Sequence, residues 1–278
     1  MRRLLTATAA VCLLLAACGQ GTADLASALK LNDDPGSALL IVRDEGGFVP
    51  VDFQVRQGPR LVLLQDGTLI TPGPQIDIFP GPLVPNYQQT RLDEEMRLFV
   101  LEELDALDFD AIGNESNDEA ANSVAAAPTT VTTFFNQDGA HTFSVYALGL
   151  GTQVDDGRVP ILANLVQRLS DVGFSQASEP YVADSIQVMA GVSEFPADPQ
   201  FANVRAWPLP VSFDQMKQNT GFGWRCDAYK AEIASGVLAE LAQGNQATTW
   251  EESGTEYSMA VRPLFPGEEP CAQIATAG

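Results

Sequence analysis

The sequence predicts an α+β fold, in which antiparallel β-hairpins with Asp-Gly or Ser-Gly turns are each packed with an amphipathic helix. The first observation is that apolar or alternating runs come in pairs around those turns, as the strands of hairpins do. The second is that segments with apolar residues every three or four positions stand beside the pairs, which is the pattern of amphipathic helices. An apolar fraction of 45% over 278 residues is typical of a globular chain that buries a sizeable core.

The first hairpin is predicted at residues 61–64 and 68–70, around Asp66-Gly67. After a loop rich in proline and glycine, Thr90 and Asp93 have the spacing of a capping box and predict the start of a helix. The buried stripe of this helix is predicted to contain Leu92, Met96, Phe99, Val100, Leu104 and Leu107.

A second unit repeats this plan. Residues 131–135 and 142–148 are the predicted strands around Asp138-Gly139. A helix is predicted across residues 161–172, with Gly173 placed to end it.

The third unit has the reverse order. A helix is predicted at residues 227–243, and a hairpin follows at residues 248–264 with its turn at Ser253-Gly254. Two further strands are predicted near residues 181–192 and 204–209.

The hairpin-and-helix plan resembles small α+β modules of uncharacterised exported bacterial proteins and of some protease- and lactamase-inhibitor domains. The resemblance is architectural, rests on no specific motif and identifies no single family. It therefore implies no role for any residue.

The domain organisation is predicted from changes in composition. Residues 18–36 are small and polar and predict a flexible tether. Residues 113–128 are polar and alanine-rich, and predict a linker between an N-terminal module at 37–112 and a C-terminal module at 129–278. A long surface loop inside one domain is the alternative for residues 113–128.

The N-terminus carries an export signal. Arg2 and Arg3 precede an apolar run at residues 4–15 that is too short to span a bilayer. The sequence Leu15-Ala16-Ala17-Cys18 resembles the lipobox of bacterial lipoproteins. The resemblance implies that residues 1–17 are a signal peptide.

It also implies that Cys18 receives a diacylglycerol and that its new amino group is acylated with a fatty acid such as palmitate. The protein is then expected on the extracytoplasmic face of the bacterial cell envelope, anchored to the membrane through this lipid. An ordinary secretory signal with a chance cysteine is the alternative interpretation of Cys18.

The charge excludes one class of partner. The net charge is −21, and it becomes −23 without residues 1–17, because two of the 15 basic residues and none of the 36 acidic ones lie there. Such a chain lacks the basic surface that nucleic-acid binding requires, so no nucleic acid is expected as a partner. It is also repelled by anionic lipid, so attachment to a membrane has to be covalent.

Two of the four cysteines are predicted to form a disulfide. Cys12 lies in the signal peptide and Cys18 is taken by the lipid, which leaves Cys226 and Cys271 as an even pair in an exported chain.

A calcium site is a minor hypothesis. Residues 108–119 follow a predicted helix and have Gly113 at the sixth position, as in an EF-hand loop. However, Ile112 occupies a ligand position and Glu115 a position that is usually apolar. An acidic linker is therefore preferred, and the candidate calcium ligands are Asp108, Asp110, Asn114, Ser116 and Glu119.

No enzyme class is indicated by a motif. His141 is the one histidine of the chain, and it falls on a strand with no nucleophile elbow beside it. One histidine and a paired set of cysteines are too few ligands for zinc. The sequence also lacks a phosphate-binding loop and a dinucleotide fingerprint, so no cofactor is predicted.

These observations predict a lipid-anchored envelope protein that acts by binding and not by catalysis. Its expected partners are the membrane, through the lipid on Cys18, and either an unknown envelope protein or a small apolar ligand. One alternative is a carrier of lipid or another apolar ligand, as in some mycobacterial-type lipoproteins, which a cavity of ligand size would favour. The other alternative is an envelope hydrolase with an unrecognised carboxylate site.

Overall fold

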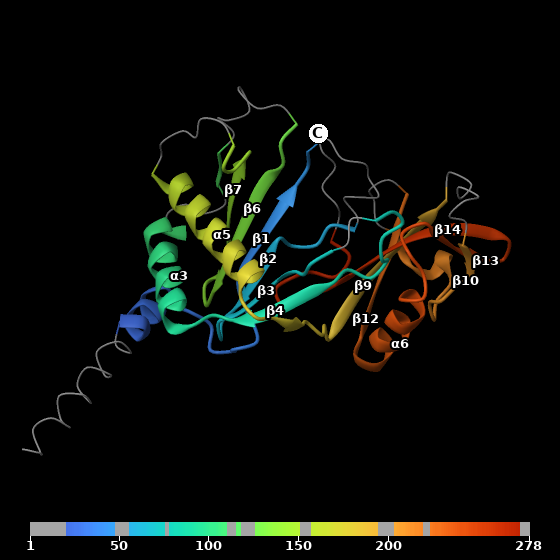
Figure 1. The fold of residues 1–278 in the computed structure, drawn as a ribbon, viewed down its shortest axis with the longest axis horizontal. Helices are drawn as coiled ribbons and strands as arrows, with labels where there is room; N and C mark the ends of the chain where they lie inside the picture. Colours follow the sequence, from blue (N-terminus) through green and yellow to red (C-terminus); the bar gives the residue numbers. More distant parts are fainter. Residues whose placement is uncertain are drawn as a thin grey trace, which may run out of the picture.

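The computed structural model describes residues 21–47, 56–75, 78–109, 115–117, 126–150, 157–193, 203–218 and 223–272. Within these ranges the chain forms two mostly antiparallel β-sheets with helices packed against them (Figure 1). This arrangement confirms the predicted α+β class. The predicted hairpins at Asp66-Gly67, Asp138-Gly139 and Ser253-Gly254 are all present as antiparallel pairs.

The first sheet has the strand order β5-β7-β6-β1-β2-β3-β4-β8 over the described residues. Its neighbouring strands are antiparallel except for β5 and β7, which are parallel. The elements of this layer are β1 (Ala38–Glu45), β2 (Leu61–Leu64), β3 (Thr68–Pro72), β4 (Tyr87–Arg91), α3 (Glu94–Leu107), β5 (Glu115–Asn117), β6 (Thr129–Asn136), β7 (Gly139–Tyr146), α5 (Arg158–Ser175) and β8 (Glu179–Pro180).

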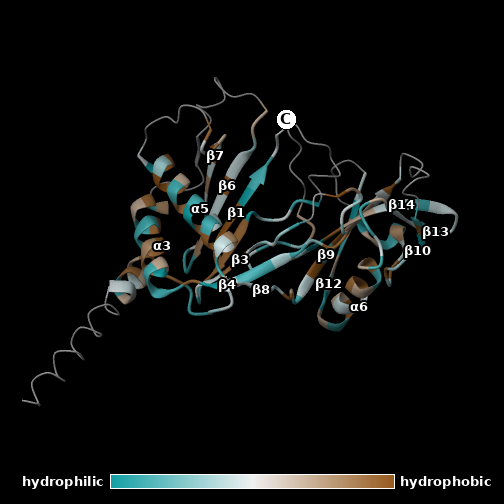
Figure 2. Ribbon diagram, viewed as in Figure 1, coloured by the Kyte–Doolittle hydropathy of each residue, from teal (hydrophilic) through white to brown (hydrophobic). Residues whose placement is uncertain are grey.

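Helices α3 and α5 lie side by side and cover one face of the first sheet (Figure 1). The alternation of a β-strand supplies the contact, since Leu61 and Leu63 of β2 face the helices and Val62 faces the opposite side. From the helices, Leu104 and Leu165 reach this core and are fully buried. Both helices carry apolar and hydrophilic residues around their turns, as amphipathic helices do (Figure 2).

The described part of the predicted tether is not extended. Residues 21–28 are helical and lie beside α3, and Leu25 and Leu29 contact the core of the first sheet. The Lys30 ammonium group forms an ion pair with Asp138 at the turn of the β6–β7 hairpin. The leucines at helical spacing outweigh the polar composition that predicted a tether, because they find an apolar surface to cover.

The second sheet has the strand order β10-β13-β14-β9-β12-β11 over the described residues. It is antiparallel except for the parallel pair β10 and β13. The elements of this layer are β9 (Ser185–Val192), β10 (Asn203–Ala206), the short 3₁₀ helix η2 (Phe213–Gln215), β11 (Lys217–Gln218), β12 (Arg225–Lys230), α6 (Ala231–Leu241), β13 (Thr248–Glu252) and β14 (Thr255–Pro263).

Helix α6 covers one face of the second sheet. Val237 and Leu241 of α6 pack with Val188 of β9 in a core on this face. Met189 of β9 points to the opposite face, where it packs with the buried Cys226 of β12.

Two connecting segments link the sheets. The loop between β3 and β4 leaves the first sheet, and its Leu83 enters the core of the second sheet, while Pro82 forms a β-bridge with Asn245. In the other direction, the segment after β14 returns to the first sheet, where Phe265 packs with Ile70 on the face that α3 and α5 leave open. Each sheet therefore buries an apolar side chain from a segment that leaves the other sheet.

This topology corrects the predicted division into modules. The hairpin β6–β7 follows the predicted linker at 113–128, yet β6 pairs with β1 in the same sheet as the N-terminal strands. The chain changes from the first sheet to the second at residues 181–184, between β8 and β9. Local sequence patterns missed this because the pairing joins strands that are far apart in the chain.

Strand pairing also changes the predicted starts of two helices. Thr90 is not the N-cap of α3, because it lies in β4 and pairs with Leu69 of β3. The N-cap is Asp93, whose Oδ1 accepts a hydrogen bond of 2.8 Å from the Met96 amide. Likewise, Asp227 belongs to β12, which pairs with β9, so that α6 begins only at Ala231.

Gly173 does not end α5, which continues to Ser175. A Cβ atom at residue 173 would come within 2.6 Å of the Thr71 side chain on β3. The glycine therefore permits close packing of the helix on the sheet, and the Gln176 amide completes the helix by donating to Val172 O.

Candidate functional site

A cavity of about 320 Å³ lies between the helix at residues 21–28, α3 and the adjoining ends of β1 and β2. Its volume falls at the lower end of the range typical of small-molecule sites. Most of the lining residues are apolar, and they include Ala26, Leu31, Leu39, Leu63, Val100 and Leu101. Three polar side chains, those of Thr22, Gln65 and Arg97, complete the wall.

Gln65 reaches the cavity from the end of β2. Its side chain is only 8% exposed, and its amide nitrogen donates to the carbonyl oxygens of Ala38 and Phe135, each at 3.2 Å. These two carbonyls fix the orientation of the amide, because only the nitrogen end can donate. The Gln65 Oε1 atom is then left without a hydrogen-bond partner among the described residues.

Arg97 reaches the cavity from the first turns of α3, and the Asp66-Gly67 turn supports its stem. The turn forms because Asp66 Oδ1 accepts from the Thr68 amide at 2.8 Å and Gly67 has a φ of 88°, which glycine adopts without strain. A Cβ atom at residue 67 would come within 2.8 Å of Arg97 Cδ, so the glycine also makes room for the arginine. The turn carbonyl of Gly67 accepts from the Leu92 amide at 2.9 Å and fixes the chain just before α3.

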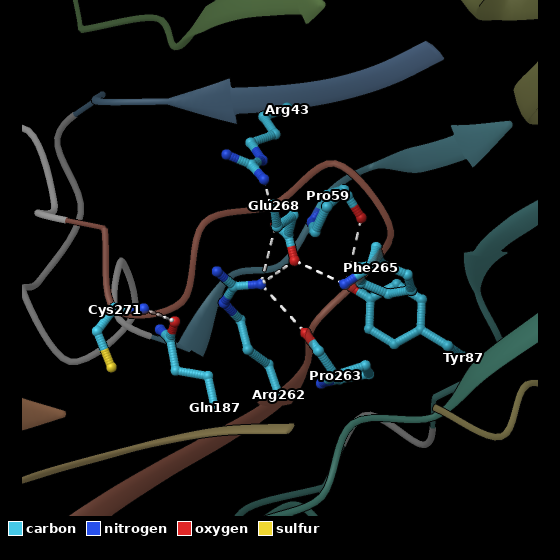
Figure 3. Close-up of polar contacts among 9 residues, drawn as sticks. All are labelled: Arg43, Pro59, Tyr87, Gln187, Arg262, Pro263, Phe265, Glu268 and Cys271. Atoms are coloured by element: carbon cyan, nitrogen blue, oxygen red, sulfur yellow. Dashed lines mark hydrogen bonds and ion pairs between the residues drawn. The ribbon is translucent and has the colours of Figure 1, made fainter. Parts of the chain in front are cut away.

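A second polar cluster joins the two sheets on the opposite face of the first sheet (Figure 3). The Glu268 carboxylate, which is 1% exposed, lies between Arg43 of β1 and Arg262 of β14. Arg262 Nη1 donates to Glu268 Oε2 at 2.8 Å, and the Phe265 amide donates to the same oxygen at 2.9 Å. Because Oε1 also accepts from both arginines, this carboxylate is fully used in holding the C-terminal segment.

Tyr87 packs beside this cluster. Its ring lies edge-on to Phe265 with the ring centroids 4.9 Å apart, and its hydroxyl donates to Pro59 O at 3.2 Å. Burial raises the pKa of Tyr87 well above its ordinary value. The neutral phenol therefore belongs to the packed core between the strands and the C-terminal segment.

The structure brings Cys226 and Cys271 together as a disulfide, with their sulfur atoms 2.03 Å apart. This bond ties β12 to the C-terminal segment that carries Glu268. The Cys271 amide donates to Gln187 Oε1 at 2.9 Å, which fixes the same segment to β9 (Figure 3).

The other predicted site residues lie mostly outside the described residues. Among the calcium candidates, Asp108 ends α3 in the left-handed conformation with a φ of 49°, and only the backbone of Ser116 is described, in β5. The described ranges contain no group of three or more His, Cys, Asp or Glu residues that could hold a metal ion. Cys18, Asp110, Asn114 and Glu119 lie outside those ranges.

His141 lies on β7, opposite Phe134 of β6. Its Nε2 atom is 3.2 Å from Asn136 Oδ1, and its ring lies 6.2 Å from that of Phe134. The histidine thus makes cross-strand contacts within the hairpin.

Sequence reasoning missed both Gln65 and Arg97. The sequence holds one hint of each residue. Gln65 is a polar residue that directly follows the apolar run of β2. Arg97 is a basic residue on the same side of the predicted helix as the apolar Val100 and Leu101, which follow it by three and four positions. Neither pattern shows that the two side chains share one cavity.

Comparison of the chain with protein-family models, with curated proteins and with solved structures gives no match. Within the described ranges, no helix has the length and apolar content needed to cross a bilayer. A functional interpretation therefore depends on the chemistry of the site itself.

Proposed function

We propose that this chain is an exported protein, anchored to the membrane by a lipid on Cys18, whose body binds a small apolar or amphipathic molecule in the cavity beside the helix at 21–28. The cavity itself, with its mostly apolar wall, is the observation that carries the proposal. Binding without catalysis is also what the sequence predicted.

The lining of the cavity supports a ligand. Its wall is mostly apolar and has a few polar side chains, which is the composition typical of small-molecule sites. A bound molecule with an apolar body would make dispersion contacts with this wall.

The position of the cavity supports a ligand that comes from the membrane. The described helix begins at Gly21, three positions after Cys18, and Thr22, Ala23 and Ala26 of this helix line the cavity. Three residues span at most about 10 Å, so a lipid on Cys18 would hold the cavity close to the bilayer surface. The paired cysteines agree with export, because disulfides persist in oxidising compartments.

Binding is tested with a neutral fluorescent probe, N-phenyl-1-naphthylamine, on the mature chain carrying Cys18→Ser, which needs no detergent. We expect saturable binding that the substitution Ala26→Trp abolishes, because the indole fills the cavity. The matched control is Ala239→Trp, at an exposed position of α6 far from the cavity, which should bind like the parent. Binding that is absent in the parent, or unchanged by Ala26→Trp, would contradict the proposal.

The anchor is tested separately by mass spectrometry of the mature protein from membranes. The expected N-terminal peptide starts at Cys18 and carries the mass of the diacylglycerol and a further acyl chain. A Cys18 peptide without lipid mass would contradict the proposed lipid anchor but not the proposed binding function.

An envelope protein remains the second candidate partner. Large apolar side chains on the surface favour it, with Phe79 on the β3–β4 loop 69% exposed and Phe174 near the end of α5 91% exposed. Chemical cross-linking in intact cells tests this alternative, and it predicts a partner that is lost when Phe174 is replaced by serine.

A further inference from the structure

The cavity adjoins a more polar hollow of about 310 Å³. Thr22, Leu92 and Arg97 line both spaces, so that Arg97 stands where the two meet. Glu94 completes the outer hollow on the exposed side of α3. An apolar chamber with a polar entrance is the shape that an amphipathic molecule fits.

Arg97 has no charged partner among the described residues. Acidic residues outnumber basic ones by 36 to 15, and arginines such as Arg91 and Arg262 have carboxylate partners. The guanidinium of Arg97, in contrast, makes no ion pair or hydrogen bond with any described residue, including the Glu94 carboxylate on the same rim. It is half-buried and held against Gly67, and is thus a fixed cation that is available to an anionic group.

The volume limits the apolar part. At about 320 Å³ the inner cavity falls at the lower end of the range of small-molecule sites, which favours one acyl chain over two.

We infer that the ligand is a single-chain anionic amphiphile, with an acyl chain in the inner cavity and a carboxylate or phosphate at Arg97. This inference rests on the proposed binding function and names the class of ligand for the same site.

The test uses the mature chain with Cys18→Ser and three probes of equal chain length, each competing with N-phenyl-1-naphthylamine. The probes are decanoate, 1-decanol and decyltrimethylammonium. We expect decanoate to bind best and the neutral and cationic probes to bind at least about tenfold more weakly, because a hydrogen bond to a charged group is worth that much. Added salt should reduce the preference for the anion.

Two variants locate the effect. Arg97→Gln should weaken decanoate about tenfold and leave 1-decanol unchanged, because only the head loses its partner. The matched control is Arg168→Gln, which removes an exposed arginine that stacks on Phe99 of α3 at 4.0 Å. That control should keep the preference for the anion.

The outcomes separate the inference from the proposed function. Equal binding of decanoate and 1-decanol, or an anion preference that survives Arg97→Gln, would overturn the head group while the cavity remains a binding site. If neither the fluorescent probe nor any of the three compounds binds, the proposed function itself fails.

Discussion

Replacing Glu268 by glutamine should destabilise the protein through the loss of one buried charge. The side chain keeps its shape, but the Arg262 guanidinium, whose side chain is 13% exposed, remains buried without a counter-charge. Arg43 is 34% exposed and can turn toward water, so its contribution is smaller. Removing one partner of a buried pair costs about 3–5 kcal/mol, and we expect the lower end, about 3 kcal/mol, because glutamine still accepts one hydrogen bond.

The measurement is equilibrium unfolding in urea, followed by the fluorescence of the 3 tryptophans. Glu102→Gln, at an exposed position of α3, is the matched control and should change the free energy of unfolding by less than about 0.5 kcal/mol. The double variant with Arg262→Met should recover part of the loss, because it also removes the uncompensated charge. A loss below about 1 kcal/mol for Glu268→Gln would refute the reasoning that this cluster joins the two sheets.

Four further outcomes follow from the same contacts. Replacing both Cys226 and Cys271 by serine should lower the free energy of unfolding by about 4 kcal/mol, because the disulfide closes a loop with a sequence separation of 45; an unchanged urea midpoint would contradict this. Asp93→Ala should cost about 1 kcal/mol in thermal unfolding followed by circular dichroism, whereas Asp93→Asn should cost little, since the amide oxygen still caps α3. Burial raises the pKa of Tyr87, so above about pH 10 the folded state keeps a proton that the unfolded state loses. The free energy of unfolding should therefore fall as the pH rises above about 10, and it should fall less steeply in Tyr87→Phe. Urea titrations from about pH 8 to 11 measure this difference. In hydrogen exchange, the amides of residues 25–29 should exchange faster than those of β2 and slow down when an amphiphile binds; equal protection of both segments would contradict this.

The hairpins could be predicted because their information is local. The β2–β3 hairpin depends on Asp66 and Gly67, whose side-chain hydrogen bond and positive φ are properties of four consecutive residues. The first residues of α3 and α6 were harder to predict from the sequence. They depend on how far β4 and β12 continue to pair with other strands, which the helical pattern does not contain.

The sheet membership and the cavity depend on long-range contacts. Strand β6 could add to either sheet by its pattern alone, and in the structure it pairs with β1. The cavity combines residues from Thr22 to Leu101, and no local motif joins them. Whether Arg97 has a carboxylate partner is likewise a property of the folded chain, since the sequence places Glu94 within reach and the structure does not pair them.

The two faces of the first sheet are held by different kinds of contact. On the face opposite the helices, Val62 of β2 packs in the core that Phe265 completes, beside the buried Glu268 pairs. On the helix face, Leu63 of the same strand lines the cavity, so its inner wall is fixed by that core. The outer wall is the helix at 21–28, and the residues that follow it are held by the half-exposed Lys30–Asp138 pair and by hydrogen bonds from Asn136 and Gln137 to the carbonyl oxygens of residues 29–31. If the cavity binds a ligand as proposed, movement of this helix would open it, and this is the element that a lipid on Cys18 would hold at the membrane.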